Sequence, residues 1–181
     1  MQIKGEEVFM KKLYSILIAM VALFVFAPLA DAKPPFWDDQ VNSPGRFKKL
    51  SEFSNAAVFD KETGLVWEQS PGTTQANWLL AQSHCNTKTV GNRKGWRLPT
   101  IQEVASLVDP TNASPALPDG HPFTLTTAQE DGFFWSATTG ADGAGVAWVV
   151  RFDSGGVGSG VDKSSGHFVW CVRGGQGVDP Q

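Results

Sequence analysis

The 181-residue chain carries 15 Lys and Arg against 18 Asp and Glu, which gives a formal net charge of −3. Nucleic-acid-binding domains normally show a basic stripe, so this balance argues against a nucleic-acid partner and against a broad surface for polyanions. The length fits one domain that buries a sizeable core.

The first 32 residues are typical of a secretory signal peptide. Lys11 and Lys12 form a basic start, residues 13–27 are almost entirely apolar, and residues 30–32 (Ala-Asp-Ala) fit a cleavage site. The alternative, an uncleaved membrane anchor, needs ~20 apolar residues. We therefore expect an exported protein, periplasmic or extracellular, with no stable membrane anchor after cleavage.

The hydrophobic pattern divides the rest of the chain into three parts. Residues 33–50 carry prolines and charges without a period, which predicts a flexible N-terminal arm. We expect one domain over residues 51–176 and a short tail over 177–181. The domain begins with a predicted hairpin, in which apolar residues 57–59 and 65–67 flank a turn with Gly64 at the position that needs a positive φ.

A first helix is predicted after the break at Pro71-Gly72, with Thr74 as its cap and its end near Lys88. Its apolar stripe would pack on a sheet. This stripe contains Trp78, Ala81 and Cys85, with Ala76, Leu80 and Ser83 beside it.

The segment from Gly95 to Glu103 predicts a short strand that leads directly into a capped helix. Pro99 favours an extended backbone at the residue before it. Thr100 followed by Glu103 matches a capping box. One face of the predicted helix is apolar, through Ile101, Val104, Ala105 and Val108. Asp109-Pro110 would end it.

The C-terminal half predicts strands separated by polar segments. In order, these are a long loop over 109–132, a strand over 133–138, a turn over 140–145, a strand over 146–153, a Gly/Ser-rich loop over 154–166 and a strand over 168–173. A hairpin, two helices and three strands predict an α+β domain with a mostly antiparallel sheet.

Cys85 and Cys171 are the two cysteines of the chain. An even pair in an exported protein predicts one disulfide, which would contribute about 4 kcal/mol in the chain-entropy model. The alternative is a thiol pair for metal binding or catalysis, which the absence of a C-x-x-C motif disfavours.

Six motifs occur in an order that resembles one bacterial family. They are Thr63 to Trp67, Trp78 to Cys85, Gly95 to Glu103, Phe134 to Thr138, Ala147 to Phe152 and Cys171 to Gly175. Together they resemble the Lcl C-terminal domain family, whose name comes from a collagen-like bacterial adhesin. The resemblance implies a C-type-lectin-like fold, in which two helices pack on a mostly antiparallel sheet with long loops. It also implies a ligand-presenting scaffold, which in the named adhesin binds sulfated glycans.

The same resemblance extends to formylglycine-generating sulfatase-modifying domains, which share an Arg-Leu-Pro-Thr element. Here that element belongs to a structural motif, formed by Trp96, Arg97, Leu98, Pro99, Thr100 and Glu103. Arg97 lies between two apolar residues, so we expect it to be half-buried and paired with Glu103 or another carboxylate. We expect most of the tryptophans to pack in the core.

Candidate ligand-binding residues lie in the polar segments, because loops on a rigid scaffold often carry recognition. They are Asp119, His121, Asp131, Asp142, Asp153, Asp162, Lys163 and His167. We expect no cofactor. Calcium is the alternative, held by loop carboxylates if several oxygen ligands converge, whereas the three histidines show no metal-ligand spacing.

We therefore expect an exported, non-enzymatic binding module for adhesion or envelope association, which recognises a glycan or a surface protein. One alternative is an enzyme related to the sulfatase-modifying domains, which would require free, metal-binding or redox-active cysteines. A second alternative is a structural component of the envelope.

Overall fold

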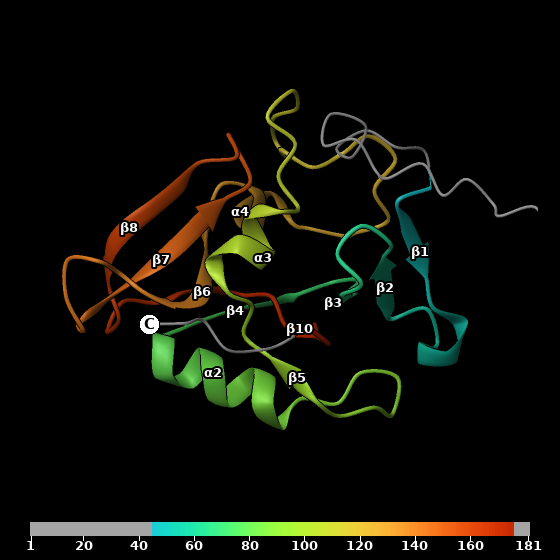
Figure 1. Cartoon of the computed structure of the whole chain (residues 1–181), viewed down its shortest axis with the longest axis horizontal. Helices are drawn as coiled ribbons and strands as arrows, with labels where there is room; N and C mark the ends of the chain where they lie inside the picture. The colour runs from blue at the N-terminus through green and yellow to red at the C-terminus, as the bar shows by residue number, and fades with distance from the viewer. Residues whose placement is uncertain (1–44, 176–181) are drawn as a thin grey trace, which may run out of the picture. The chain divides into compact units, whose positions relative to one another are not determined.

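The computed structural model describes residues 45–175, which form an α+β domain with two sheets (Figure 1). The predicted signal peptide, most of the predicted arm and the predicted tail lie outside the described residues. Within the described part, no helix is long and apolar enough to cross a membrane.

The first sheet is antiparallel throughout and has the strand order β1-β2-β3-β10-β5. Its strands are β1 (Phe47–Lys49), β2 (Ala57–Asp60), β3 (Val66–Glu68), β5 (Trp96–Arg97) and β10 (Val172–Arg173). The predicted hairpin is confirmed as β2 and β3, and Gly64 has the expected positive φ of 70°. The last strand of the domain thus lies between β3 and β5.

The second sheet has the order β4-β9-β6-β7-β8. Its strands are β4 (Gly72–Ala76), β6 (Phe133–Thr139), β7 (Val146–Arg151), β8 (Val157–Asp162) and β9 (His167–Val169). All neighbouring strands are antiparallel except β6 and β9. Two sheets therefore replace the single sheet expected from the sequence.

The helical elements are short, and α2 is the longest of those described. They are η1 (Ser51–Phe53), α2 (Trp78–Thr87), α3 (Ile101–Ala105) and α4 (Thr127–Glu130). A complete capping box is present at α3, as the sequence predicts. The helix is shorter than expected, because backbone bonds from Leu107 and Val108 reach back only three residues and tighten its end.

The second sheet is buried on both faces in its central strands. Neighbouring residues of a strand point to opposite faces, and here they enter two different apolar clusters. Phe134 of β6 packs in the cluster that contains Val104 of α3, whereas Trp135 packs in the cluster that contains Ala81 and Cys85 of α2. The two helices thus cover opposite faces of this sheet.

Three predicted boundaries are wrong, each because tertiary pairing overrides a weak local pattern. Residues 72–76 form strand β4 on β9, so the first helix begins later than predicted, and the side chain of Asn77 rather than Thr74 caps it. The Gly/Ser-rich loop contains β8, which pairs with β7. The predicted strand over 168–173 changes sheet between Val169 and Val172.

The predicted arm is also wrong at its C-terminal end, because residues 47–49 pair with β2. Arg46 precedes this strand and is buried. Its guanidinium donates two hydrogen bonds, of 2.9 and 2.8 Å, to the buried carboxylate of Asp60, and a third to the carbonyl of Ser106. This network joins β1 to the hairpin and to the end of α3.

Candidate recognition surface

The structural motif from Trp96 to Glu103 forms as the sequence predicts. Arg97 donates hydrogen bonds of 2.7 and 2.6 Å to the two carboxylate oxygens of Glu103. Glu103 also accepts from the backbone N–H of Thr100, as part of the capping box. Arg97 is therefore a bidentate structural partner of the α3 cap.

The same arginine holds the C-terminal end of the described chain. Its Nη2 donates to the carbonyl of Gly174 at 2.6 Å. Gly175 follows with a φ of 67°, and a Cβ at this position would lie 2.8 Å from both Arg97 Nη2 and Glu103 Oε1. The Gly-Gly pair thus supplies both the backbone conformation and the space that this contact requires.

The predicted disulfide is present between Cys85 of α2 and Cys171, with Cα atoms 5.4 Å apart. Both cysteines are fully buried. Next to it, the buried carboxylate of Glu68 accepts from the backbone N–H of Cys171 at 2.8 Å and pairs with Lys88 at 2.5 Å. The C-terminal end of α2 is therefore fixed covalently and by an ion pair to the link between the two sheets.

The candidate loop residues fall into two groups, because the polar segments meet at different ends of β7. At the start of β7, the N–H of Lys163 donates to the carbonyl of Gly145, which joins the turns over 140–145 and 162–166. Asp142 and Asp162 belong to this group, and Asp162 accepts from the backbone N–H of Ser164. That bond lowers the pKa of Asp162, as expected for a carboxylate that caps a turn.

The second group lies at the other end of β7. Backbone bonds from Ser114 to Asp153 and from Ala116 to Phe152 join the loop after α3 to this end. Asp153 pairs with Arg151. Asp119 and His121 follow Ala116 in the same loop, and Asp131 follows α4.

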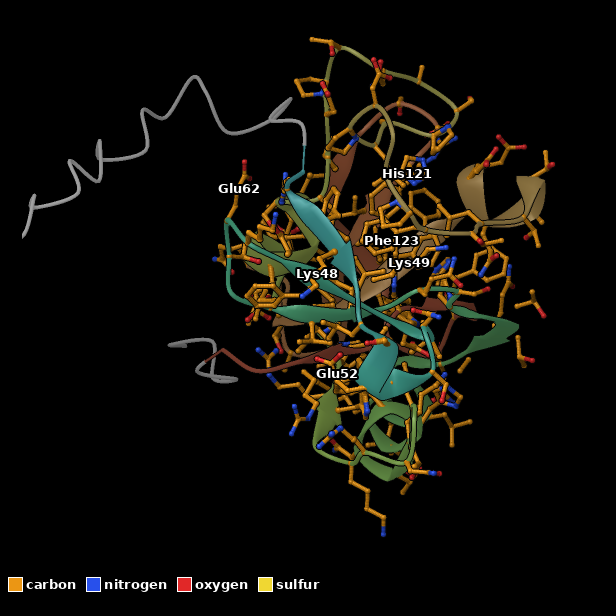
Figure 2. All side chains as sticks on the ribbon, turned by 90° about the vertical axis from the view of Figure 1, so that its right-hand side faces the viewer. Lys48, Lys49, Glu52, Glu62, His121 and Phe123 are labelled. Atoms are coloured by element: carbon orange, nitrogen blue, oxygen red, sulfur yellow. A yellow bond between two sulfur atoms is a disulfide. The ribbon has the colours of Figure 1, made fainter. Side chains whose placement is uncertain are left out.

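Both candidate histidines pack against aromatic rings. His121 stacks on Phe123 with ring centroids 6.0 Å apart, beside β1 (Figure 2). His167 lies 4.7 Å from the ring of Trp135 and 5.4 Å from that of Phe133. Burial lowers the pKa of both imidazoles. Within residues 45–175, His121 Nδ1 and His167 Nε2 have no hydrogen-bond partner.

Metal ligation was the alternative for the loop carboxylates. In the described part of the chain, no three His, Cys, Asp or Glu side chains come together as a metal site. The expectation that the domain needs no cofactor stays a prediction.

Among the candidate residues, Lys163 contacts the largest number of different helices, strands and turns. Its ammonium lies 3.9 Å from the centroid of the Trp78 ring at the start of α2, a favourable cation–π position. It also donates 2.9 Å hydrogen bonds to Thr139 at the end of β6 and to the carbonyl of Ala144. The backbone N–H of Trp78 in turn donates to the carbonyl of Lys163. We call this arrangement the Trp78–Lys163 junction.

Two leucines next to the junction are exposed, which the sequence reasoning missed. Leu79 is 71% exposed and Leu80 is 58% exposed, and Val157 on β8 is the third exposed large hydrophobic residue described. The sequence places Leu80 beside the predicted packed stripe of this helix. The helix starts at Trp78 instead of near Thr74, and its buried residues are Ala81 and Cys85, which both belong to the predicted stripe. The asparagine that caps the helix was the signal for this later start.

These features define a rigid, disulfide-linked α+β domain that displays a junction of one helix and two turns. A family model for the Lcl C-terminal domain matches residues 56–173, so the chain belongs to this family. A search of curated proteins found no significant relative.

Proposed function

We propose that this domain is an exported, non-enzymatic binding module that recognises a surface protein through the Trp78–Lys163 junction and the adjoining leucines. The observation that carries this proposal is the pair of exposed leucines on a helix whose other end is linked by the disulfide. Exposed adjacent apolar side chains beside a polar rim are typical of protein interaction sites. A glycan is the second candidate, since a half-buried tryptophan such as Trp78 offers an apolar body with a polar rim.

Export is supported by the signal-like N-terminal sequence and by the disulfide, because disulfides persist in oxidising compartments. The non-enzymatic assignment is supported by the state of the cysteines, which the enzyme alternative requires to be reactive. The proposal also includes a C-type-lectin-like arrangement of the fold, supported by the family membership, by the two sheets and by the link from the first long helix to the last strands.

The test measures binding of the fluorescently labelled, exported protein to intact cells and to a glycan array, with and without a calcium chelator. Protease treatment of the cells should abolish binding if the ligand is a surface protein. Binding that survives protease and reappears on the array would support the glycan instead.

Matched variants locate the surface. The double change Leu79→Ser and Leu80→Ser should weaken binding at least tenfold without changing stability by more than about 0.5 kcal/mol, because both side chains are exposed. Val157→Ser removes an exposed apolar side chain from β8 and should leave binding unchanged. Equal binding by the leucine variant and the original chain would place the site elsewhere.

A further inference from the structure

A second surface gathers positive charge at the opposite end of α2. It consists of Arg93 and Lys94 in the turn between α2 and β5, together with Arg173 on β10. Both arginines lie against the ring of Phe53, at 5.1 and 5.9 Å from its centroid. We call these three cations the Phe53 patch.

The turn that carries Arg93 is held rigidly. Val90 and Arg93 exchange two backbone hydrogen bonds, of 3.1 and 3.0 Å, around Gly91 and Asn92, which both have positive φ. This is the geometry of a tight two-residue hairpin turn. A Cβ at Gly91 would overlap the backbone of Phe53, so the turn lies directly on η1.

The other two cations are positioned by the same turn. Trp96 Nε1 donates to the carbonyl of Arg93 at 2.8 Å, and Arg173 Nε donates to the carbonyl of Lys94 at 3.0 Å. These contacts hold the backbone of Arg93 and Lys94 and place the Arg173 guanidinium against the turn, while the Lys94 side chain is exposed.

The charges of the Phe53 patch are not neutralised by the rest of the described chain. Within residues 45–175, no carboxylate forms an ion pair with any of the three cations, whereas neighbouring Lys88 is paired with Glu68. The one carboxylate on η1 is that of exposed Glu52 (Figure 2). A local excess of positive charge therefore exists on a chain whose net charge is −3.

Negative charge gathers on the other side of the domain. In Figure 1 the turn between α2 and β5 lies at the bottom, and the loop between α3 and α4 lies at the top. That loop and α4 carry exposed Asp119 and half-buried Glu130, with exposed Asp131 directly after them and no Lys or Arg, whereas Asp109 is buried. An extended polyanion is best bound by a long stripe of cations, and this patch is compact. A compact basic patch opposite an acidic side would instead orient the domain on a flat anionic surface, with the basic side facing that surface.

We propose that the Phe53 patch binds phosphate-bearing lipid headgroups and thereby docks the domain on an anionic membrane surface. Basic side chains close to such a surface each contribute favourably within about one Debye length. The proposal rests on the proposed export but not on the Trp78–Lys163 junction. Its failure can therefore be distinguished from that of the recognition surface, because the leucine variant should bind vesicles normally.

The test is co-sedimentation of the exported chain with vesicles of phosphatidylglycerol and phosphatidylcholine in equal amounts, and with vesicles of phosphatidylcholine alone. We expect binding to the anionic vesicles at 20 mM salt that is lost at 500 mM salt. Replacing all three cations by Gln should lower the partition coefficient roughly 100-fold. The control with Lys48, Lys49 and Lys61 replaced by Gln loses the same charge at exposed positions elsewhere and should still bind.

Loss of Arg173 could disturb β10, so a second variant changes only Arg93→Gln and Lys94→Gln. The side chains of Arg93 and Lys94 are both exposed, so this variant should fold normally. It should lower binding at least tenfold. Absence of vesicle binding by the original chain, or an equal loss in the control, would overturn the proposal. Binding of millimolar inorganic phosphate without any vesicle binding would also overturn it, because it would indicate a site for a free anion. Binding to a sulfated polysaccharide alone would overturn it as well.

Discussion

Replacing Asp60 by Ala should destabilise the domain by about 3 kcal/mol or more. Asp60 is fully buried, and Arg46 is 5% exposed. Removing one member of a buried, hydrogen-bonded ion pair leaves an uncompensated charge, which typically costs 3–5 kcal/mol. We expect the lower end of this range, because Glu62 lies 3.1 Å from Arg46 Nε and can take part of the charge. This loss is a large share of a typical stability of 5–15 kcal/mol.

A second variant separates the buried charge from the lost packing. Replacing the pair together, Arg46→Met with Asp60→Leu, removes both charges, so it should cost clearly less than Asp60→Ala alone. The assay is urea unfolding of the oxidised protein at pH 7, followed by tryptophan fluorescence. A loss below 1 kcal/mol in Asp60→Ala would refute the reasoning, as would a double variant that is less stable than the single one.

The remaining predictions concern three other contacts. Gly175→Ala should lower stability by about 1–2 kcal/mol, because the residue has a positive φ and the added Cβ would push against Arg97 and Glu103; an unchanged urea midpoint would contradict this. Replacing both Cys85 and Cys171 by Ala should cost about 4 kcal/mol in thermal or urea unfolding, and a loss below 1 kcal/mol would show that the loop is already constrained when unfolded. Burial holds the pKa of His167 below its ordinary value of 6.5, so its neutral form stabilises the fold above pH 6.5 and this contribution is lost as the pH falls toward the lowered pKa. His167→Phe should therefore reduce the loss of stability between pH 7.5 and 5.5, and an identical pH dependence in both proteins would exclude this histidine as the cause.

The sequence predicts best those elements whose local signals and tertiary contacts agree. Thr100 and Glu103 form the capping box at α3, and Arg97 pairs with Glu103, because the spacing of these residues leaves few other arrangements for a half-buried guanidinium. The disulfide follows in the same way from two cysteines in a chain whose first residues are predicted to form a secretory signal.

The errors occur where the side chains carry little information. Strand β8 has the sequence Val-Gly-Ser-Gly-Val-Asp, which reads as a loop, and it is a strand because its backbone pairs with β7 at the edge of the sheet. Strand β4 has the polar sequence Gly-Thr-Thr-Gln-Ala, and it too is a strand because its backbone pairs with a neighbour, β9, at the other edge of the sheet. The change of sheet after Val169 has no local signal either, because residues 168–172 are all apolar and all buried.

The candidate surface was the least predictable part. Proximity of Trp78, Thr139 and Lys163 depends on how α2, β6 and β8 are placed, and their sequence separation gives no indication of it. The Phe53 patch depends in the same way on contacts between η1, the turn before β5 and the last strand. Charge counting over the whole chain hides this patch, because the acidic residues of the loop before α4 cancel it.

The position of β10 between β3 and β5 has a consequence for biosynthesis. Neither neighbour has its full set of backbone partners until Val172 and Arg173 have been synthesised. Cys171, the disulfide partner of Cys85, is also synthesised only with the last few residues of the domain. A ribosome that stops early therefore releases a chain with two open strand edges and a free thiol, which chaperones and proteases recognise. The domain therefore completes its fold only after essentially all of it has been made.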